Sequence, residues 1–518
     1  MSLKRMLEDV AARYGGKTAI ILGDRRLSFA ELDEASNRMA NALIKMGVNK
    51  GDRVAILLPN SPEFAVTYFG IAKIGAIAAL LDTNYKFDEL ASVFNDCLPE
   101  VLVTESPALE PLIPVLPRFQ SIEHIIDLSP KYAGKFISYQ EIMASSPAQR
   151  VNVEPGPEDI AHIGYTSGPS FYPRGIMLSH GQLVREANIS GDGFQQTDNE
   201  MMILFALPLH HMFGFVAALL ASLFKGSTVV IVPGTGLSIG SLMATIESVK
   251  GTMFLGVPYI FALMIDMAER EGIKNDLSSL RLCISAGAPL PIDTIQRFKR
   301  YFGFDIIDVW GLSEATCHVT CPSLNGTGKI GSAGKALPGW EVKIVDDKGR
   351  ESPPGQAGEI IVRGLVMKGY YNNPQATAET IRDGWLYTGD IGKLDEEGNL
   401  FITGRKKDTI IVKGQNIYPG DIESVLSTHP EVVEAAVIGI PDALRGEIVG
   451  AAIRLKEGAA ATEQEIKRFC LERIASYKAP KQVMFLDSLP RTATGQIDRE
   501  GLRKRLLIPP VFPETATP

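Results

Sequence analysis

Apolar and polar residues alternate along the chain in two rhythms. In residues 28–46 the apolar positions recur every three or four residues, which predicts an amphipathic helix with Ser28 as its N-cap. Short apolar runs and helical patterns then alternate, predicting strands at 53–58, 76–81 and 101–104 and a helix at 61–74. This alternation predicts an α/β fold, with layers around a largely parallel sheet.

The pattern changes twice in the second half of the chain. Gly and Pro become dense at residues 325–339, and two short strands are predicted at 340–345 and 359–363, typical of a β-rich subdomain. The second change comes near residue 404. Beyond it the pattern predicts helices at 422–427 and 463–474 and strands at 432–440 and 449–454. This is the rhythm of a small α+β domain of about 110 residues.

Composition narrows the class of protein. The chain has 518 residues, and 45% of them are hydrophobic, which excludes a mainly disordered chain. Its length excludes a single small domain, because one core rarely exceeds about 250–300 residues. Lys and Arg number 52 against 60 Asp and Glu, so the net charge is −8. This balance gives no reason to expect nucleic acid or an anionic membrane as the main partner.

Targeting and redox signals favour the cytoplasm. Acidic residues stand within the first sixteen positions, where a secretory signal would have its apolar run. The most apolar stretch, residues 213–224, is about 12 residues long, whereas a membrane span needs about 20, so we expect a buried helix. The five cysteines are scattered without a CxxC pair, which indicates a reducing compartment and no structural zinc.

The loop after Tyr165 has the composition of a phosphate-binding loop. A strand is predicted at 160–165, small and hydroxylated residues fill 166–175, and a helix is predicted from Ile176 onward. A strand, loop and helix in this order can present backbone N–H groups to an anion. The Walker A spacing is absent, and on this loop alone a connecting segment without function is an equal alternative.

The loop resembles the YTSGTTGxPKG signature of the adenylate-forming (ANL) superfamily: acyl-CoA synthetases, luciferases and peptide-synthetase adenylation domains. The matching residues are Tyr165, Thr166, Ser167, Gly168, Pro173 and Gly175. The family's Thr-Thr-Gly is replaced by Pro169, Ser170 and Phe171, and its Lys by Arg174. Pro169 removes a hydroxyl and a backbone donor, and Phe171 removes the conformational freedom of Gly.

Five further segments resemble family motifs, in the family's order. They are LPLHHMFG at 207–214, SAGAPL at 285–290, DVWGLSE at 308–314, WLYTGD at 385–390, and GRKKD at 404–408 with GQNIYP at 414–419. The resemblance implies a nucleotide site made by Thr166, Ser167, Gly168, Ser170, Arg174, Gly287, Ala288, Pro289, Asp308, Val309, Trp310, Gly311, Leu312, Ser313, Asp390, Arg405 and Gly414. The closest likeness is to acyl-CoA synthetases.

The resemblance also implies individual roles. Trp310 would stack on adenine, Asp308 would accept from its amino group, and Asp390 would accept from both ribose hydroxyls while Arg405 contacts the ribose. Two catalytic positions are implied: Glu314 would hold Mg²⁺, and His211 would lie at the acyl pocket. Asp408 would be the hinge between an N-terminal domain, 1–407, and a mobile C-terminal domain, 408–518.

The third catalytic position of the family is changed in this chain. The family motif PRTxxGKI corresponds to residues 490–497, and its catalytic lysine is Gln496. In the family this lysine steadies charge while the substrate carboxylate attacks the α-phosphate. Gln donates hydrogen bonds without charge, and losing one such donor costs on the order of 3–4 kcal/mol.

Three functions therefore remain open. The first is an AMP-forming carboxylate–CoA ligase that uses ATP, Mg²⁺ and CoA, with Arg174 and a relocated cation compensating. The second is an enzyme that only transfers an acyl group from an acyl-adenylate or acyl-CoA to CoA or an amine. The third is a non-catalytic nucleotide- or acyl-CoA-binding protein. We expect a stand-alone protein that can form a homodimer. Because residues 212–216 and 311–312 are apolar, we expect the substrate to be an aliphatic or aromatic acid.

Overall fold

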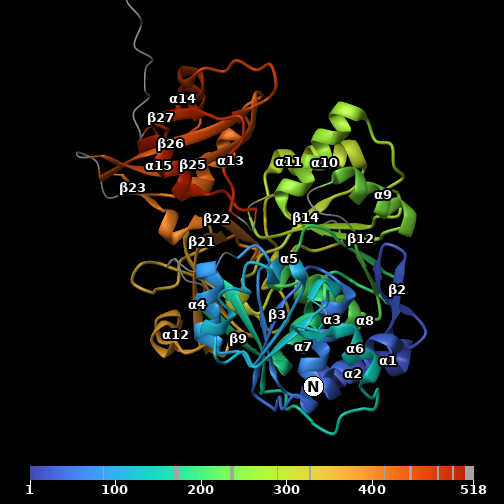
Figure 1. Cartoon of the computed structure of the whole chain (residues 1–518). Coiled ribbons are helices and arrows are strands. Elements are labelled where there is room, and N and C mark those ends of the chain that lie inside the picture. The colour runs from blue at the N-terminus through green and yellow to red at the C-terminus, as the bar shows by residue number, and fades with distance from the viewer. Residues whose placement is uncertain are drawn as a thin grey trace, which may run out of the picture.

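The computed structural model describes residues 1–85, 87–132, 134–166, 174–233, 238–288, 290–325, 328–412, 415–442, 446–474, 476, 478–492 and 495–507. Two large sheets and the helices that pack on them form the greater part of the chain. A small C-terminal domain, red and orange in Figure 1, stands above them. Within the described residues, no helix has the length and apolarity needed to cross a membrane.

The first sheet has seven strands. Their order is β14 (Ile306–Asp308), β13 (Leu282–Ser285), β12 (Met253–Gly256), β10 (Met201–Leu204), β11 (Thr228–Ile231), β1 (Thr18–Leu22) and β2 (Arg25–Ser28). All pairs are parallel except β1 with β2. One face is covered by α9 (Ile239–Val249), α10 (Pro258–Glu271) and α11 (Ile292–Phe302).

The second sheet has eight strands. Their order is β19 (Gly369–Tyr370), β9 (Arg174–Ser179), β8 (Ile160–Thr166), β4 (Ile77–Leu80), β3 (Arg53–Leu57), β5 (Val101–Thr104), β6 (His124–Asp127) and β7 (Ile137–Ser138). From β8 to β7 the pairs are parallel, whereas β9 and β19 are antiparallel to their neighbours. Helix α4 (Phe87–Cys97) packs on its outer face.

A helical layer lies between the two sheets. It contains α1 (Leu3–Tyr14), α2 (Phe29–Lys45), α3 (Pro62–Lys73), α7 (His180–Gly193), a π-helix at Phe213–Leu220 and α8 (Ala221–Lys225). Shorter helices at the edges are α5 (Ser106–Leu109), α6 (Tyr139–Ser145) and α12 (Pro374–Thr380). The predicted helix of residues 28–46 is α2, and Ser28 closes a capping box with Glu31.

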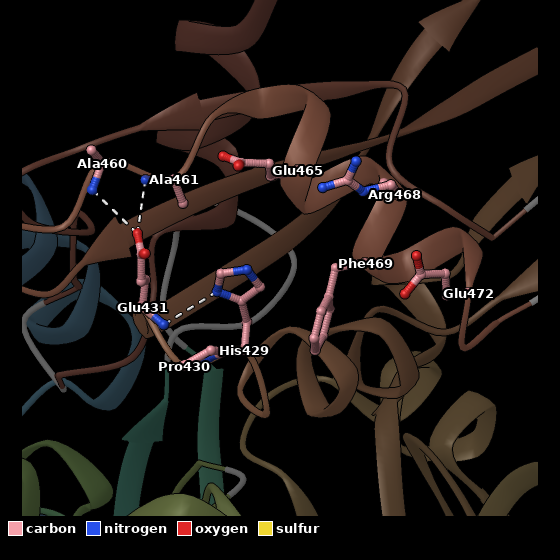
Figure 2. Close-up of a pocket in the computed structure, with 9 residues that line it drawn as sticks. All are labelled: His429, Pro430, Glu431, Ala460, Ala461, Glu465, Arg468, Phe469 and Glu472. Carbon is pink, nitrogen blue, oxygen red and sulfur yellow. Dashed lines mark hydrogen bonds between the residues drawn. The ribbon is translucent and has the colours of Figure 1, made fainter.

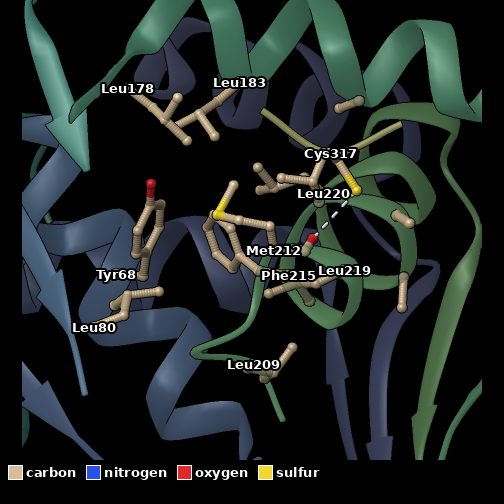
Figure 3. Packing of buried hydrophobic residues seen from close by; sticks show 14 of the residues in the cluster. Tyr68, Leu80, Leu178, Leu183, Leu209, Met212, Phe215, Leu219, Leu220 and Cys317 are labelled. Carbon is tan, nitrogen blue, oxygen red and sulfur yellow. Dashed lines mark hydrogen bonds between the residues drawn. The ribbon is translucent and has the colours of Figure 1, made fainter. Parts of the chain in front are cut away.

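The predicted buried helix at residues 213–224 is also confirmed, and its first part is a π-helix. Its residues pack in the central layer, where the rings of Tyr68 and Phe215 meet edge-on with centroids 4.4 Å apart (Figure 3). Beside them the Cys317 thiol donates to the carbonyl of Met212 at 3.5 Å. This hydrogen bond therefore links Met212, just before the helix, to Cys317, far along the chain.

One sequence prediction was wrong. Residues from Arg174 to Ser179 form strand β9, not a helix, and they pair antiparallel with β8, with Gly164 opposite Ile176. Helix α7 begins only after Ser179, which caps it together with Gln182. A short apolar run such as residues 176–178 suits a strand or a helix, and pairing with β8 decides it. The loop after Tyr165 thus joins two strands, so no helix N-terminus follows it.

A third, antiparallel sheet leads to the small domain. It contains β17 (Glu341–Val345), β18 (Gly358–Arg363), β20 (Ile381–Arg382), β21 (Trp385–Leu394) and β22 (Leu400–Arg405), beside a two-stranded pair, β15 (Thr320–Cys321) and β16 (Lys335–Ala336). The small domain has strands β23 (Ile410–Val412), β24 (Gln415–Ile417), β25 (Val432–Asp442), β26 (Gly446–Leu455) and β27 (Gln482–Phe485). Helices α13 (Pro419–Leu426) and α14 (Glu463–Leu471) pack on one face, and α15 (Arg499–Leu507) packs on the other.

A buried acid in the central layer makes stability depend on pH. Burial raises the pKa of Glu186 to about 8, although the Glu186 carboxylate accepts from the His318 backbone N–H at 2.9 Å and from the Ser190 hydroxyl at 3.3 Å. Burial also lowers the pKa of His318 to about 3, so this ring is neutral above that pH. The folded state holds the Glu186 proton to higher pH than the unfolded state. Glu186 therefore contributes its full stabilisation of the folded state below about pH 4.5, and this contribution is lost as pH rises through 8.

We expect Glu186→Gln to remove this loss, because the neutral amide keeps an acceptor oxygen and cannot ionise. The thermal midpoint of the variant should match that of the native chain at pH 5 and exceed it by a few degrees at pH 8.5, measured by calorimetry. An equal difference between the two proteins at both pH values would contradict this assignment.

Candidate active site

Residues expected to bind adenine gather where parallel strands of the first sheet end. Asp308 is the last residue of β14 and pairs with Ser285, the last residue of β13. Gly287 follows two residues later with φ +84°, a left-handed conformation that favours glycine. The carboxyl ends of parallel strands are the usual ligand-binding edge of such sheets.

Two polar atoms at this edge lack protein partners. Within the described residues, Asp308 Oδ1 and Ser285 Oγ are buried without a hydrogen-bond partner. Burial raises the pKa of Asp308 to about 8, with a hydrogen bond from the Leu290 backbone acting in the opposite direction. A buried acceptor without a donor is costly, so this edge is suited to a ligand that brings an N–H group.

A second group joins the third sheet to this edge. The indole Nε1 of Trp310 donates to Asp390 Oδ2 at 2.9 Å, and Arg405 Nε lies 3.2 Å from Asp390 Oδ1. Asp390 and Arg405 stand opposite each other in the β21–β22 ladder. Burial raises the pKa of Asp390, and the charge of Arg405 and the Trp310 hydrogen bond oppose the shift.

A third group surrounds Glu314, which lies in a short 3₁₀ turn, Ser313–Ala315. The hydroxyl of Tyr370 donates to Glu314 Oε1 at 3.0 Å, and the guanidinium carbon of Arg174 lies 5.5 Å from the centre of the Tyr370 ring. Burial raises the pKa of Glu314. Sequence reasoning missed Tyr370, because its partner Glu314 lies 56 positions away along the chain.

The two histidines of the 207–214 segment have different surroundings. Burial lowers the pKa of His211 to about 4, so it is neutral near pH 7, and its Nδ1 accepts from the Phe213 N–H at 3.4 Å. His210 Nε2 lies 3.6 Å from Asp82 Oδ2. Burial acts to raise the pKa of Asp82, but the interaction with His210 and the hydrogen bonds from the Asn84 backbone and side chain together lower it, and the net shift is downward.

Asn60 holds the segment before these histidines in place. Its amide nitrogen donates to the Leu207 carbonyl at 2.8 Å, and its amide oxygen accepts from the Leu209 N–H at 2.7 Å. Sequence reasoning missed Asn60 as well, because the two partners are about 150 positions away along the chain.

The other described residues of the predicted site line the same region. Val309 and Ser313 are buried, and Leu312 and Ala288 are half-buried. A Cβ at Gly311 would lie 1.8 Å from the carbonyl oxygen of Cys317, so only glycine fits there. The predicted residues Ser167, Gly168, Ser170, Pro289 and Gly414 lie outside the described residues, as do Pro169, Phe171 and the side chain of Thr166.

Gln496 reaches this site from the small domain. Its side-chain amide donates to the carbonyl of Gly287 at 2.9 Å. Two lysines that lie in or near the family motifs bond acids elsewhere: Lys406 donates to Glu359 at 2.8 Å, and Lys478 donates to Asp421 at 3.3 Å. The position of the family lysine itself is occupied by an uncharged amide.

A hollow of about 710 Å³ on the small domain is separate from this site. Figure 2 shows its lining, which comes from residues 429–431 and 460–472. Glu431 accepts from the backbone N–H groups of Ala460 and Ala461, and His429 Nδ1 accepts from the Glu431 N–H. These polar groups are used within the domain, and the hollow shares no residue with the candidate site.

Comparisons with known proteins agree with this geometry. The family model of the AMP-binding enzymes matches residues 7–371, and that of the AMP-binding enzyme C-terminal domain matches residues 421–496. The chain belongs to the AMP-binding enzyme family. A long-chain-fatty-acid–CoA ligase of Bacillus subtilis is 32% identical, over 98% of this chain and 94% of its own.

Solved structures of family members have the same architecture. An anthranilate CoA ligase in complex with anthranoyl-AMP superimposes with a TM-score of 0.91 at 31% identity, covering 98% of this chain and 97% of its own. ATP-bound MatB from Rhodopseudomonas palustris gives 0.89 at 31% identity, and apo MatB gives 0.79 at 30%; both cover 98% of this chain and 99% of their own. The predicted fold and enzyme class are confirmed: this is an acid–thiol ligase of the acyl-CoA synthetase type.

Proposed function

We propose that this AMP-binding enzyme completes both half-reactions with a glutamine at the position of the family lysine. A substrate carboxylate oxygen attacks the α-phosphorus of ATP, giving an acyl-adenylate and releasing pyrophosphate. The thiolate of CoA then attacks the acyl carbon, forming the thioester and releasing AMP. The observation that carries the proposal is the 2.9 Å hydrogen bond from Gln496 to Gly287, which brings an amide donor to the candidate nucleotide site.

The unpartnered atoms at the sheet edge fit ATP. Asp308 Oδ1 is a buried acceptor, and the exocyclic amino group of adenine is a matching donor. Asp390 and Arg405 have the geometry to bind the ribose hydroxyls, since each Asp390 oxygen keeps a free lone pair beside its present partner. The better superposition on ATP-bound MatB than on apo MatB supports a small domain placed for adenylation.

Glu314 fits Mg²⁺ through its second carboxylate oxygen, since Tyr370 occupies only Oε1. The ion would offset charge on the phosphate oxygens of bound nucleotide. Arg174 lies next to the ring of Tyr370, the residue that bonds this carboxylate, and would face the same phosphates. The chain differs from the family motifs at residues 169–171 of the loop and at Gln496. We expect both differences to slow adenylation.

The assignment of Asp308 can be tested by nucleotide choice. Asp308→Ala removes the acceptor for the amino group, and we expect the preference of kcat/KM for ATP over ITP, which has a 6-oxo group, to fall roughly 10- to 100-fold. Asp308→Asn keeps one acceptor oxygen and is the matched control, expected to retain most of the preference. An unchanged preference in Asp308→Ala would place adenine elsewhere.

Adenylation itself is tested by acid-dependent exchange of labelled pyrophosphate into ATP by the native chain. Exchange supports the proposal, because it requires reversible formation of an acyl-adenylate. The second candidate function, acyl transfer alone, is favoured by the missing cation at residue 496. Its signature would be no exchange together with thioester formation from a synthetic acyl-adenylate and CoA.

Further features of this enzyme remain proposals. The hinge at Asp408 is supported by its place between β22 of the third sheet and β23 of the small domain. In addition, Arg499 Nε lies 3.8 Å from Asp408 Oδ2. We therefore propose domains 1–407 and 408–518. An aliphatic or aromatic acid, a cytoplasmic location and a homodimer stay predictions.

A further inference from the structure

Arg491 joins the two domains at the base of the hairpin that carries Gln496. Within the small domain its Nη1 donates to the Gly495 carbonyl at 2.8 Å, and its Nη2 pairs with Glu434. Across the domain boundary its guanidinium carbon lies 4.4 Å from the centre of the Tyr259 ring. A cation this close to an aromatic face is attracted by the ring, most strongly when partly shielded from water.

Backbone hydrogen bonds join residues 491–492 to residues 495–497. Arg491 and Ile497 form an antiparallel bridge, the Thr492 N–H donates to the Gln496 carbonyl at 2.8 Å, and the Gly495 N–H donates to the Thr492 carbonyl at 2.9 Å. Arg491 therefore holds the same backbone turn from which the Gln496 side chain extends. Moving Arg491 relative to the large domain moves Gln496 with it.

Two contacts of this hairpin with the large domain fall on neighbouring strand ends. Tyr259 is the second residue of α10, which follows the end of β12 at Gly256. Gly256 pairs with Ser285 of β13, and Gly287 follows Ser285 by two residues. Arg491 on Tyr259 and Gln496 on Gly287 thus attach one hairpin to one edge of the first sheet at two points.

We infer that Arg491 is a positioning residue for adenylation: seated on Tyr259, it sets the orientation of the small domain in which Gln496 reaches the nucleotide site. The inference rests on the proposed function for its effect on adenylation, but the orientation itself does not depend on catalysis. Because Gln496 has no charge to draw it toward phosphate oxygens, the orientation must come from contacts outside the reacting atoms. Arg491 and Tyr259 supply one.

Tyr259 is the residue to change first, because it lies in the large domain and its loss cannot disturb folding of the hairpin. We expect Tyr259→Ala to lower kcat for acid-dependent pyrophosphate exchange about tenfold, with KM for ATP nearly unchanged. Thioester formation from synthetic acyl-adenylate should stay within twofold of native. Tyr259→Phe keeps the ring face and should restore exchange, and Arg491→Ala should add little to Tyr259→Ala.

A distance measurement separates this inference from the proposed function. All five native cysteines are buried, so spin labels can be placed at Ile273→Cys on the large domain and Leu471→Cys on the small domain, both exposed. We expect one main distance in the otherwise native chain and a broadened distribution in Tyr259→Ala and Arg491→Ala. If the native chain shows no exchange, the proposed function fails, and the distances still decide the inference. Unchanged distances in both variants would overturn it.

Discussion

Adenylation by Gln496→Lys is expected to run roughly 10- to 100-fold faster than by the native chain, because an ammonium adds charge where the amide supplies only a hydrogen bond. Gln496 already lies 2.9 Å from the Gly287 carbonyl, so the longer lysine reaches the same site without moving the hairpin. Pyrophosphate exchange measures this gain directly. Thioester formation from synthetic acyl-adenylate should not change, because only the first half-reaction uses this residue.

Gln496→Met is the matched control for this experiment. Methionine has a similar length and no donor, so exchange should fall below that of the native chain if the amide contributes a hydrogen bond. A gain of less than twofold in Gln496→Lys would contradict the expectation. It would mean that another cation already supplies the charge during adenylation.

Asp390→Ala is expected to cause the largest loss, lowering kcat/KM for ATP roughly 100- to 1000-fold. The change removes the proposed acceptor of the ribose hydroxyls and leaves Trp310 Nε1 and Arg405 without their present partner. Because the ribose stays bound through both half-reactions, acyl transfer from synthetic acyl-adenylate should fall as well. Steady-state kinetics of both half-reactions measure the two effects.

Two controls separate binding from folding. Asp390→Asn keeps an acceptor for Trp310 but loses the charge, so it should fall between Asp390→Ala and the native chain. Glu351→Ala removes an exposed acid paired with Lys343 at 2.7 Å beside the same sheet, and it should keep native activity. If Asp390→Ala retains more than a tenth of native kcat/KM with an unchanged melting temperature, the ribose is bound elsewhere.

Long periodic elements could be predicted from the sequence, whereas short ones depended on distant partners. Helix α2 carries its own signal, since its apolar stripe and the Ser28 cap are local. Strand β9 does not, because its six residues become a strand only by pairing with β8. This difference bears on the proposed function: because no helix begins directly after the 166–174 loop, the phosphate binding proposed there would rely on Arg174 and on groups of the loop itself.

The residues of the candidate site also fall into two groups: those that a sequence motif predicts and those that only the structure reveals. Asp308, Trp310, Asp390 and Arg405 stand in motifs, and the structure brings them to one edge. Tyr370, Asn60 and Tyr259 have no motif, because each acts through a partner that lies 56 to 232 positions away along the chain. Such contacts follow from the packing of sheets and domains, which a local pattern does not contain.

The most direct test incubates the native chain with ATP, Mg²⁺, CoA and a pooled panel of aliphatic and aromatic acids, and follows AMP and acyl-CoA together by mass spectrometry. We predict that both products form in equal amounts, with the mass of the thioester naming the acid. Thioester formation only when a synthetic acyl-adenylate replaces ATP and acid would contradict a complete ligase and show that the chain transfers acyl groups without activating them.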